Sequence, residues 1–136
     1  MNIMVIDGQG GGMGKQLVDK IKKTFPELEI LAVGTNSLAT QAMIKAGADH
    51  AATGENAVVV GCRTANVIVG PIGIVIADSL WGEITSKMAE AVGQSNALRI
   101  LLPVNLCNNY IAGVEKRTTV EMIDDCIAKI RSLVER

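Results

Sequence analysis

Short apolar runs alternate with segments of helical periodicity along the chain. The runs are rich in β-branched residues and lack polar alternation, which is typical of strands buried on both faces. Strands that alternate with helices predict a parallel sheet covered by helices on both sides. Right-handed crossovers then give a Rossmann-like, doubly wound three-layer α/β sandwich. We expect strands at residues 2–7, 28–34, 65–70 and 98–104.

Three segments between these strands carry apolar residues at helical spacing. The first covers 13–25, has lysines on its opposite side and ends before Pro26. The second covers 36–46, and Gly47 supplies its C-terminal stop. The third covers 86–92 with some residues on either side.

The C-terminal segment carries the clearest helix pattern. Thr118 and Glu121 have the spacing of a capping box. Apolar residues then repeat every three or four positions, which predicts one buried stripe. The stripe consists of Val120, Ile123, Ile127, Ile130 and Val134.

Four segments are open to more than one interpretation. Residues 48–52 fit a short third strand, and residues 53–62 fit either a short helix that starts at Thr53 or another strand. Residues 71–84 form an apolar irregular segment, and residues 108–114 fit a last edge strand. The sheet should therefore hold about five or six strands, mostly parallel.

Length and composition limit the classes of protein to consider. The 136 residues fit one domain, residues 1–136, and 49% apolar content is enough for a core. A net charge of −1 without a basic block argues against nucleic acid or a membrane surface as partner. Three cysteines without C-x-x-C spacing argue against a disulfide framework or a zinc site. Reduced thiols and the lack of a leader-like start favour a cytoplasmic protein.

The most unusual local feature is the stretch IDGQGGGMGKQ, residues 6–16, in which five of eleven residues are glycine. Glycine costs conformational entropy on folding, so this number requires a compensating gain. A tight turn, close helix packing or a ligand that needs bare backbone would supply it. Strand-to-helix connections are short, of about 2–6 residues, and we infer that a turn alone does not require so many glycines.

Two phosphate-loop patterns fail on this stretch. The dinucleotide pattern G-x-G-x-x-G places its third glycine at Met13. The P-loop pattern G-x-x-x-x-G-K-[ST] meets Gln9 at its first glycine and Gln16 at the magnesium-binding hydroxyl. Nucleotide hydrolysis of the P-loop type is therefore not supported.

A third pattern, G-x-x-x-G-x-G, matches at Gly8, Gly12 and Gly14. In this respect the first thirty-five residues resemble the first turn of short-chain dehydrogenases. The resemblance implies a backbone cradle for a phosphate at a helix N-terminus. That family's catalytic tyrosine has a lysine four residues later, whereas here Tyr110 is the only tyrosine and Val114 follows at that distance. A dehydrogenase of this class is not supported.

The chain as a whole resembles a small bacterial family of Rossmann-like proteins, a domain of unknown function. The resemblance rests on the segments IDGQGGGMGK, GTN, ATGENA, GPIGI and LLPVN, which span most of residues 3–105. It implies the fold and no particular reaction.

We therefore expect a phosphate-bearing small molecule, such as a nucleotide or dinucleotide, at the carboxyl ends of the strands. Lys15 would neutralise the phosphate, and residues 35–37 would face a sugar or base. Those residues include no acid to hold a ribose and no arginine for a 2′-phosphate, so NAD(P) and other nucleotides remain equal candidates. The predicted binding residues are Gly8, Gln9, Gly10, Gly11, Gly12, Met13, Gly14, Lys15, Thr35, Asn36 and Ser37.

Other polar residues follow the predicted strands. Asp7 could bind a hydroxyl or a metal, but a structural role that holds the loop amides is favoured. Asp78 and Glu83 could act as an acid–base pair, although such residues more often cap a helix. His50 and Cys107 have no evident partners for catalysis. For Thr53, Glu55 and Asn56, a helix cap and a ligand contact have equal weight. Asn105, Asn108 and Asn109 could contact a base or sugar, but turns are slightly favoured.

The apolar run at residues 66–77 is longer than one strand requires. We expect self-association to cover the excess, in a homodimer or larger, with residues 71–81 near the contact. A lid over a ligand is the alternative. Two other functions also stay open, an assembly or regulatory protein with a vestigial loop, and an enzyme whose site is completed at a subunit interface by Asp7, Glu55 or Asp78.

Overall fold

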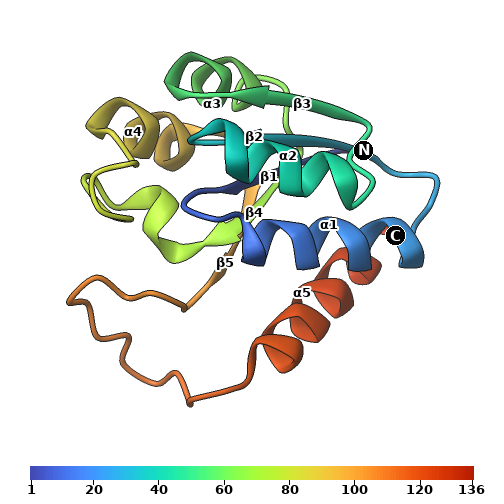
Figure 1. The fold of residues 1–136 in the computed structure, drawn as a ribbon. Helices are drawn as coiled ribbons and strands as arrows, with labels where there is room; N and C mark the ends of the chain where they lie inside the picture. Colours follow the sequence, from blue (N-terminus) through green and yellow to red (C-terminus); the bar gives the residue numbers. More distant parts are fainter.

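Five parallel strands form one sheet in the order β3-β2-β1-β4-β5 (Figure 1). This computed structural model describes all residues 1–136. From β1 the chain adds β2 and β3 on one side of the sheet, and then crosses back to add β4 and β5 on the other side. The strand order therefore reverses between β1 and β4. In sheets of this type, ligands bind at the carboxyl ends beside such a reversal. The strands are β1 (Asn2–Asp7), β2 (Glu29–Gly34), β3 (His50–Thr53), β4 (Val67–Pro71) and β5 (Leu98–Leu102).

Helices cover both faces of the sheet, as the strand pattern predicts (Figure 1). One face carries α1 (Gly12–Thr24), α2 (Ser37–Lys45) and α5 (Thr119–Val134). The other carries α3 (Glu55–Gly61), the 3₁₀ helix η1 (Ile72–Val75) and α4 (Ser86–Gln94). None of these helices combines the length and the apolar character that a bilayer crossing requires.

The continuous apolar sequence of β1 follows from its central position. Ile3 and Val5 point into the core beneath α1 and α5, while Met4 and Ile6 point into the core beneath α3 and α4. All four side chains are buried. A central strand with helices on both faces has no solvent side, so it shows no alternation of polar and apolar residues.

Most of the predicted elements are confirmed, with short shifts at their ends. Residues 48–52 contain strand β3, and the ambiguous segment 53–62 forms helix α3. The helix-cap interpretation of Thr53 is wrong, because Gly54 is the N-cap of α3 and no side chain caps it. The predicted edge strand at 108–114 is also wrong. That segment pairs with no strand, so the sheet ends at β5.

The apolar segment after β4 is covered within the monomer. It folds as η1 and a set of turns, which insert Ile74 and Leu80 into the core beneath α4. The excess hydrophobicity of residues 66–77 therefore does not require a second subunit. Trp81 is the exception, since 95% of its surface is exposed. The expected contact at residues 71–81 then depends on Trp81 alone and stays a prediction.

In the C-terminal helix the predicted capping box is confirmed, but the predicted length of the buried stripe is wrong. The capping box is present, with Thr118 and Glu121 bonded reciprocally. Val120 is 65% exposed and Val134 is 37% exposed, so the stripe is shorter than its periodicity predicts. Only the middle turns of α5 bury their apolar side chains, at Ile123, Cys126, Ile127 and Ile130.

Candidate functional site

The glycine-rich loop joins β1 to α1 at the carboxyl edge of the sheet, beside the reversal of strand order (Figure 1). A pocket of about 430 Å³ opens against it. The other wall of this pocket comes from the segment after η1 and from the chain that follows β5. The residues around it are Asp7, Gly8, Gln9, Gly10, Gly11, Gly12, Met13, Gln16, Leu80, Val104, Asn105 and Thr119.

Three of the five glycines are required by the loop's own packing. Gly11 has a φ of 75°, in the left-handed region that favours glycine. A Cβ on Gly14 would lie 2.6 Å from Sδ of Met43, and one on Gly8 would lie 2.7 Å from Oγ1 of Thr35. These three positions therefore need no ligand to explain them.

Gly10 and Gly12 have no such requirement. A Cβ at either position would meet no atom within 4 Å, and neither has a φ in the left-handed region. Both residues are exposed and line the pocket. Glycine costs conformational entropy, and neither packing nor backbone dihedrals explain these two glycines.

Asp7 holds the loop by two main-chain contacts. Its Oδ1 accepts from the amide of Gly8 at 2.8 Å, and its Oδ2 accepts from the amide of Gly14 at 2.6 Å. Burial raises the pKa of Asp7, although these two hydrogen bonds act in the opposite direction, and the negative charge of Glu83 adds to the rise. The favoured structural role of Asp7 agrees with these contacts.

Glu83 contacts the glycine loop, which the sequence did not predict. Its Oε1 accepts from the amide of Gln9 at 2.8 Å, from the hydroxyl of Thr35 at 2.5 Å and from Nδ2 of Asn36 at 2.9 Å. Burial acts to raise the pKa of Glu83, but these three hydrogen bonds together hold it below its ordinary value. Glu83 therefore places a negative charge between the loop and the end of β2.

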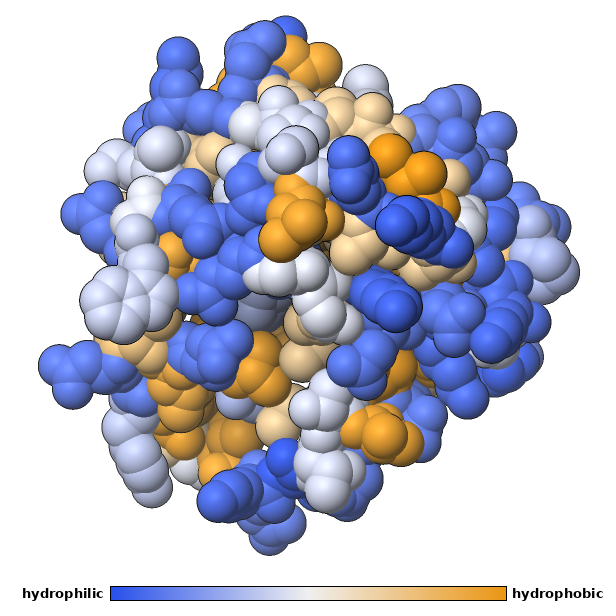
Figure 2. Space-filling view, viewed as in Figure 1, coloured by the Kyte–Doolittle hydropathy of each residue, from blue (hydrophilic) through white to orange (hydrophobic).

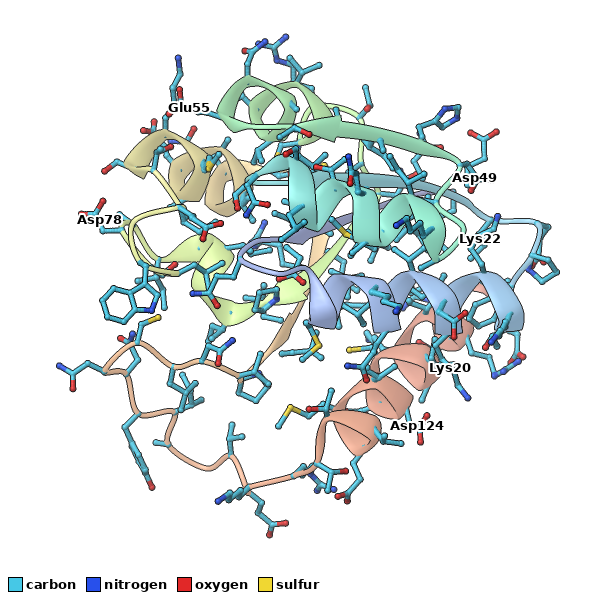
Figure 3. The ribbon with its side chains drawn as sticks, in the orientation of Figure 1. Lys20, Lys22, Asp49, Glu55, Asp78 and Asp124 are labelled. Atoms are coloured by element: carbon cyan, nitrogen blue, oxygen red, sulfur yellow. The ribbon has the colours of Figure 1, made fainter.

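Neither Glu83 nor Asp78 caps a helix, so that interpretation is wrong. The N-cap of α4 is Thr85, whose side chain accepts from the amide of Met88. Asp78 is exposed, with a φ of 65°, in a turn where its amide donates to the carbonyl of Ile84 at 2.7 Å (Figure 3). The only sequence signal for Glu83 is an acid within an otherwise apolar segment on the ligand side of β4.

Three amides of the loop stay free. Those of Gly10, Gly12 and Met13 donate to no protein acceptor, whereas the Gly11 amide donates to the carbonyl of Gly8 at 3.0 Å. The free groups lie at the N-terminus of α1, which has no acidic residue in its first turn. Such a terminus favours an anion by its dipole and by its unpaired N–H groups.

The predicted binding residues divide into two groups in space. The residues from Gly8 to Met13 line the pocket, while Gly14 supports it from below through Asp7. Lys15 is exposed and does not line the pocket. Thr35 and Asn36 contact Glu83, and Ser37 is exposed. The assignment of Lys15 and of residues 35–37 to a ligand stays a prediction.

The other candidate residues do not form a catalytic set around the pocket. Glu55 accepts from the hydroxyl of Thr85 at 2.7 Å (Figure 3). His50 lies 3.8 Å from Glu29 at the start of β3, which is the opposite end of the sheet. No three His, Cys, Asp or Glu side chains gather as a metal-binding group. Asn105 is the one predicted turn residue that lines the pocket.

The turn interpretation of the neighbouring asparagines agrees with the structure. Asn108 has a φ of 65°, and Nδ2 of Asn109 donates to the carbonyl of Leu106 at 2.7 Å. Cys107 is exposed and also left-handed, with a φ of 48°. No basic side chain bonds to its thiol, which contacts the carbonyl of Asn105.

The fold and the glycine loop together define a Rossmann-like α/β protein with a pocket at its switch point. The chain belongs to the family described as domain of unknown function DUF3842, whose model matches residues 2–135. No curated protein matches it. Among solved structures, it resembles a dodecameric FMN-dependent Ubix-like decarboxylase from Escherichia coli O157:H7. That likeness has 14% identity and a TM-score of 0.43, over 100% of this chain and 96% of the other, and it says nothing about the ligand of the present chain.

Proposed function

We propose that the protein binds a phosphate-bearing small molecule in the pocket beside the glycine loop. The observation that carries this proposal is that Gly10 and Gly12 have neither a packing nor a dihedral reason to be glycine. Both lie where bare backbone meets the pocket. A ligand that needs close approach to main-chain N–H groups explains them, as in other strand–loop–helix phosphate sites.

The free amides supply the phosphate contacts in this proposal. Those of Gly10, Gly12 and Met13 have no protein acceptor and would donate to phosphate oxygens. The N-terminus of α1 adds partial positive charge. Asp7 opposes an anion when it is ionised, and burial raises its pKa, which lessens that opposition. Lys15, in the first turn of the helix and without an ion pair in the chain, offsets the rest.

The rest of the ligand extends toward β4 and β5, away from β2. Leu80 and Val104 offer apolar surface there, while Asn105 and Gln16 offer amide groups. The path toward β2 is occupied by the carboxylate of Glu83 on Thr35 and Asn36. A pocket of about 430 Å³ is at the small end of ligand sites, which range over about 300–1,000 Å³. A mononucleotide or a sugar phosphate therefore fits the proposal better than a dinucleotide.

The test is a binding series by isothermal titration calorimetry with inorganic phosphate, a sugar phosphate, AMP, GMP and NAD. We expect at least one monophosphate to bind, and we expect Gly12→Glu to abolish that binding by placing a carboxylate at the free amides. The matched control is Gly93→Glu, since Gly93 is also an exposed glycine with no atom within 4 Å of its Cβ position, but lies in α4.

Native mass spectrometry of protein purified from cells complements the titrations. A retained phosphate compound supports the proposal. Binding that survives in Gly12→Glu would contradict the assignment of the loop. A protein that is empty, with no response to the whole panel, would instead support an assembly or regulatory role with a vestigial loop. An enzyme completed at a subunit interface would require binding that depends on the oligomer.

A further inference from the structure

The outer edge of β5 carries backbone groups with no partner. The amide of Leu98 donates to the carbonyl of Asn66, beside β4, at 3.0 Å. Because N–H and C=O groups alternate sides along a strand, Arg99 and Leu101 point theirs away from the sheet. No strand lies beyond β5. An open edge of this kind is a template for pairing with another strand.

The free part of this edge is symmetric about Ile100. On one side, the next outward position is Ala97, whose amide already donates to Oγ of Ser95 at 3.1 Å. On the other side it is Pro103, which has no N–H. Arg99 and Leu101 are therefore each one residue away from Ile100. Ala97 and Pro103, where the free N–H groups end, are each three residues away from it. A two-fold axis at Ile100 would therefore let both unpaired residues of each copy pair reciprocally, Arg99 with Leu101 and Leu101 with Arg99.

An apolar groove accompanies the edge. It has a volume of about 450 Å³ and runs along the whole of β5, between the strand, α5 and the segment that precedes α5. Leu98 is 40% exposed and Val114 is 49% exposed along it. Figure 2 shows that apolar side chains also gather at the lower left, around the long connection between β5 and α5. Apolar surface therefore stays exposed along this edge, although charged side chains also line the groove.

Two charges on α5 line the same groove. Asp125 and Lys129 are one turn apart and exposed, and neither forms an ion pair within the chain. The other charged side chains of the groove are engaged, since Arg117 lies 3.7 Å from Glu115 and Arg99 donates to the carbonyl of Ser95 at 2.7 Å. The unpaired charges are of opposite sign, which suits a second copy related by a two-fold axis.

We propose that β5 pairs antiparallel with β5 of a second copy about a two-fold axis at Ile100, which makes one continuous ten-stranded sheet. Arg99 and Leu101 exchange N–H···O bonds with Leu101 and Arg99 of the second copy. Ile100 faces its own equivalent, and Leu98 faces Leu102 of the second copy. An axis perpendicular to the sheet also sets the two α5 helices antiparallel, so Asp125 faces Lys129 of the second copy.

The test is the oligomeric state of the full chain by sedimentation velocity over a range of concentrations. We expect wild-type protein to form a dimer. Leu101→Pro removes one outward N–H without removing a bond to β4, because proline is tolerated at edge positions whose N–H faces away from the sheet. It should give a monomer with an unchanged circular dichroism spectrum.

A charge exchange on α5 tests the geometry without altering the strand. Asp125→Lys places like charges across the axis and should weaken the dimer, whereas the double change Asp125→Lys with Lys129→Asp should restore it. Asp124→Lys is the matched control, because Asp124 is exposed on the same helix but does not line the groove (Figure 3). It should leave the dimer intact.

Three results would overturn the proposal. Wild-type protein could be a monomer at every concentration, which would leave the edge to an extended peptide of another protein. A dimer could be equally stable in Leu101→Pro and Asp125→Lys, which would place the interface elsewhere. The double exchange could fail to restore a dimer that Asp125→Lys had weakened, which would exclude the antiparallel pairing of α5. None of these outcomes bears on ligand binding at the glycine loop.

Discussion

The carboxylate of Glu83 accepts a hydrogen bond from the hydroxyl of Thr35 at 2.5 Å, although the two residues are 48 positions apart in the chain. The same oxygen also bonds the amide of Gln9. Glu83 thus connects the segment before α4 to the loop after β1 and to the end of β2. This contact explains why the pocket opens toward β4 and β5 rather than toward β2.

Removal of this carboxylate should loosen the glycine loop. Glu83→Ala leaves the hydroxyl of Thr35, the amide of Asn36 and the backbone of Gln9 without their shared acceptor, and a hydrogen bond to a charged group contributes about 1.5–3 kcal/mol. We expect the free energy of unfolding to fall by about 2–3 kcal/mol in urea titrations, since water will satisfy part of the loss. Glu90→Ala, on the exposed face of α4, should change it by less than about 0.5 kcal/mol.

The two acids of the loop should give stability curves of opposite slope against pH. Burial raises the pKa of Asp7 in the folded state, so its contribution to stability is fully present below the unfolded value and is lost as pH rises through the folded pKa. Against Asp7→Asn, wild-type protein should therefore lose relative stability as pH rises from 3.8 upward.

Glu83 supplies the internal comparison for that experiment. Burial acts to raise its pKa, but the hydrogen bonds outweigh this and hold it low, so its contribution is present above pH 4.5 and is lost as pH falls through the folded pKa. Against Glu83→Gln, wild-type protein should lose relative stability as pH falls. The measurement is the free energy of unfolding of all three proteins between pH 3 and pH 7. Slopes of the same sign would contradict one of the two assignments, and the sign would show which.

Replacement by alanine should change the free energy of unfolding in opposite directions at two glycines of the loop. Gly12 has open space at its Cβ position and an ordinary φ, so Gly12→Ala should raise the free energy of unfolding by about 0.4–1 kcal/mol through the unfolded state. Gly14→Ala would press a methyl group against Met43 and Asp7, at 2.6 and 2.8 Å, and should lower it by about 1–3 kcal/mol. Thermal unfolding of both variants makes the comparison, and equal losses would refute the distinction.

The shortened stripe of α5 leads to a further comparison. Ile130 is fully buried against the core beneath α1, and Ile130→Ala should cost about 2–5 kcal/mol. Val120 belongs to the same periodic pattern but is 65% exposed, so Val120→Ala should change stability by less than about 0.5 kcal/mol. Chemical denaturation of the two variants measures both effects. A large loss at Val120 would show that the first turn of α5 is covered in solution.

Local patterns predicted much of the fold because they depend on near neighbours in the chain. The β1 run and the Thr118 capping box needed no tertiary information. The segment 108–114 failed because a strand exists only where a partner edge accepts it, and three residues from Asn105 to Asn108 adopt left-handed backbone instead. Trp81 and Ile74 show the same limit, since one apolar segment was buried in part by η1 and in part left exposed.

The sequence by itself determined the alternation of strands and helices, the parallel sheet and the position of the glycine loop at its carboxyl edge, because periodicity and turn chemistry act over a few residues. Only the tertiary structure decided which of the loop amides are free. The carboxylates of Asp7 and Glu83 accept from three other loop amides, those of Gly8, Gln9 and Gly14. One of these contacts joins residues 74 positions apart, and no local pattern encodes such a distance. The shape of the pocket, and the side of the sheet to which it opens, follow from those contacts.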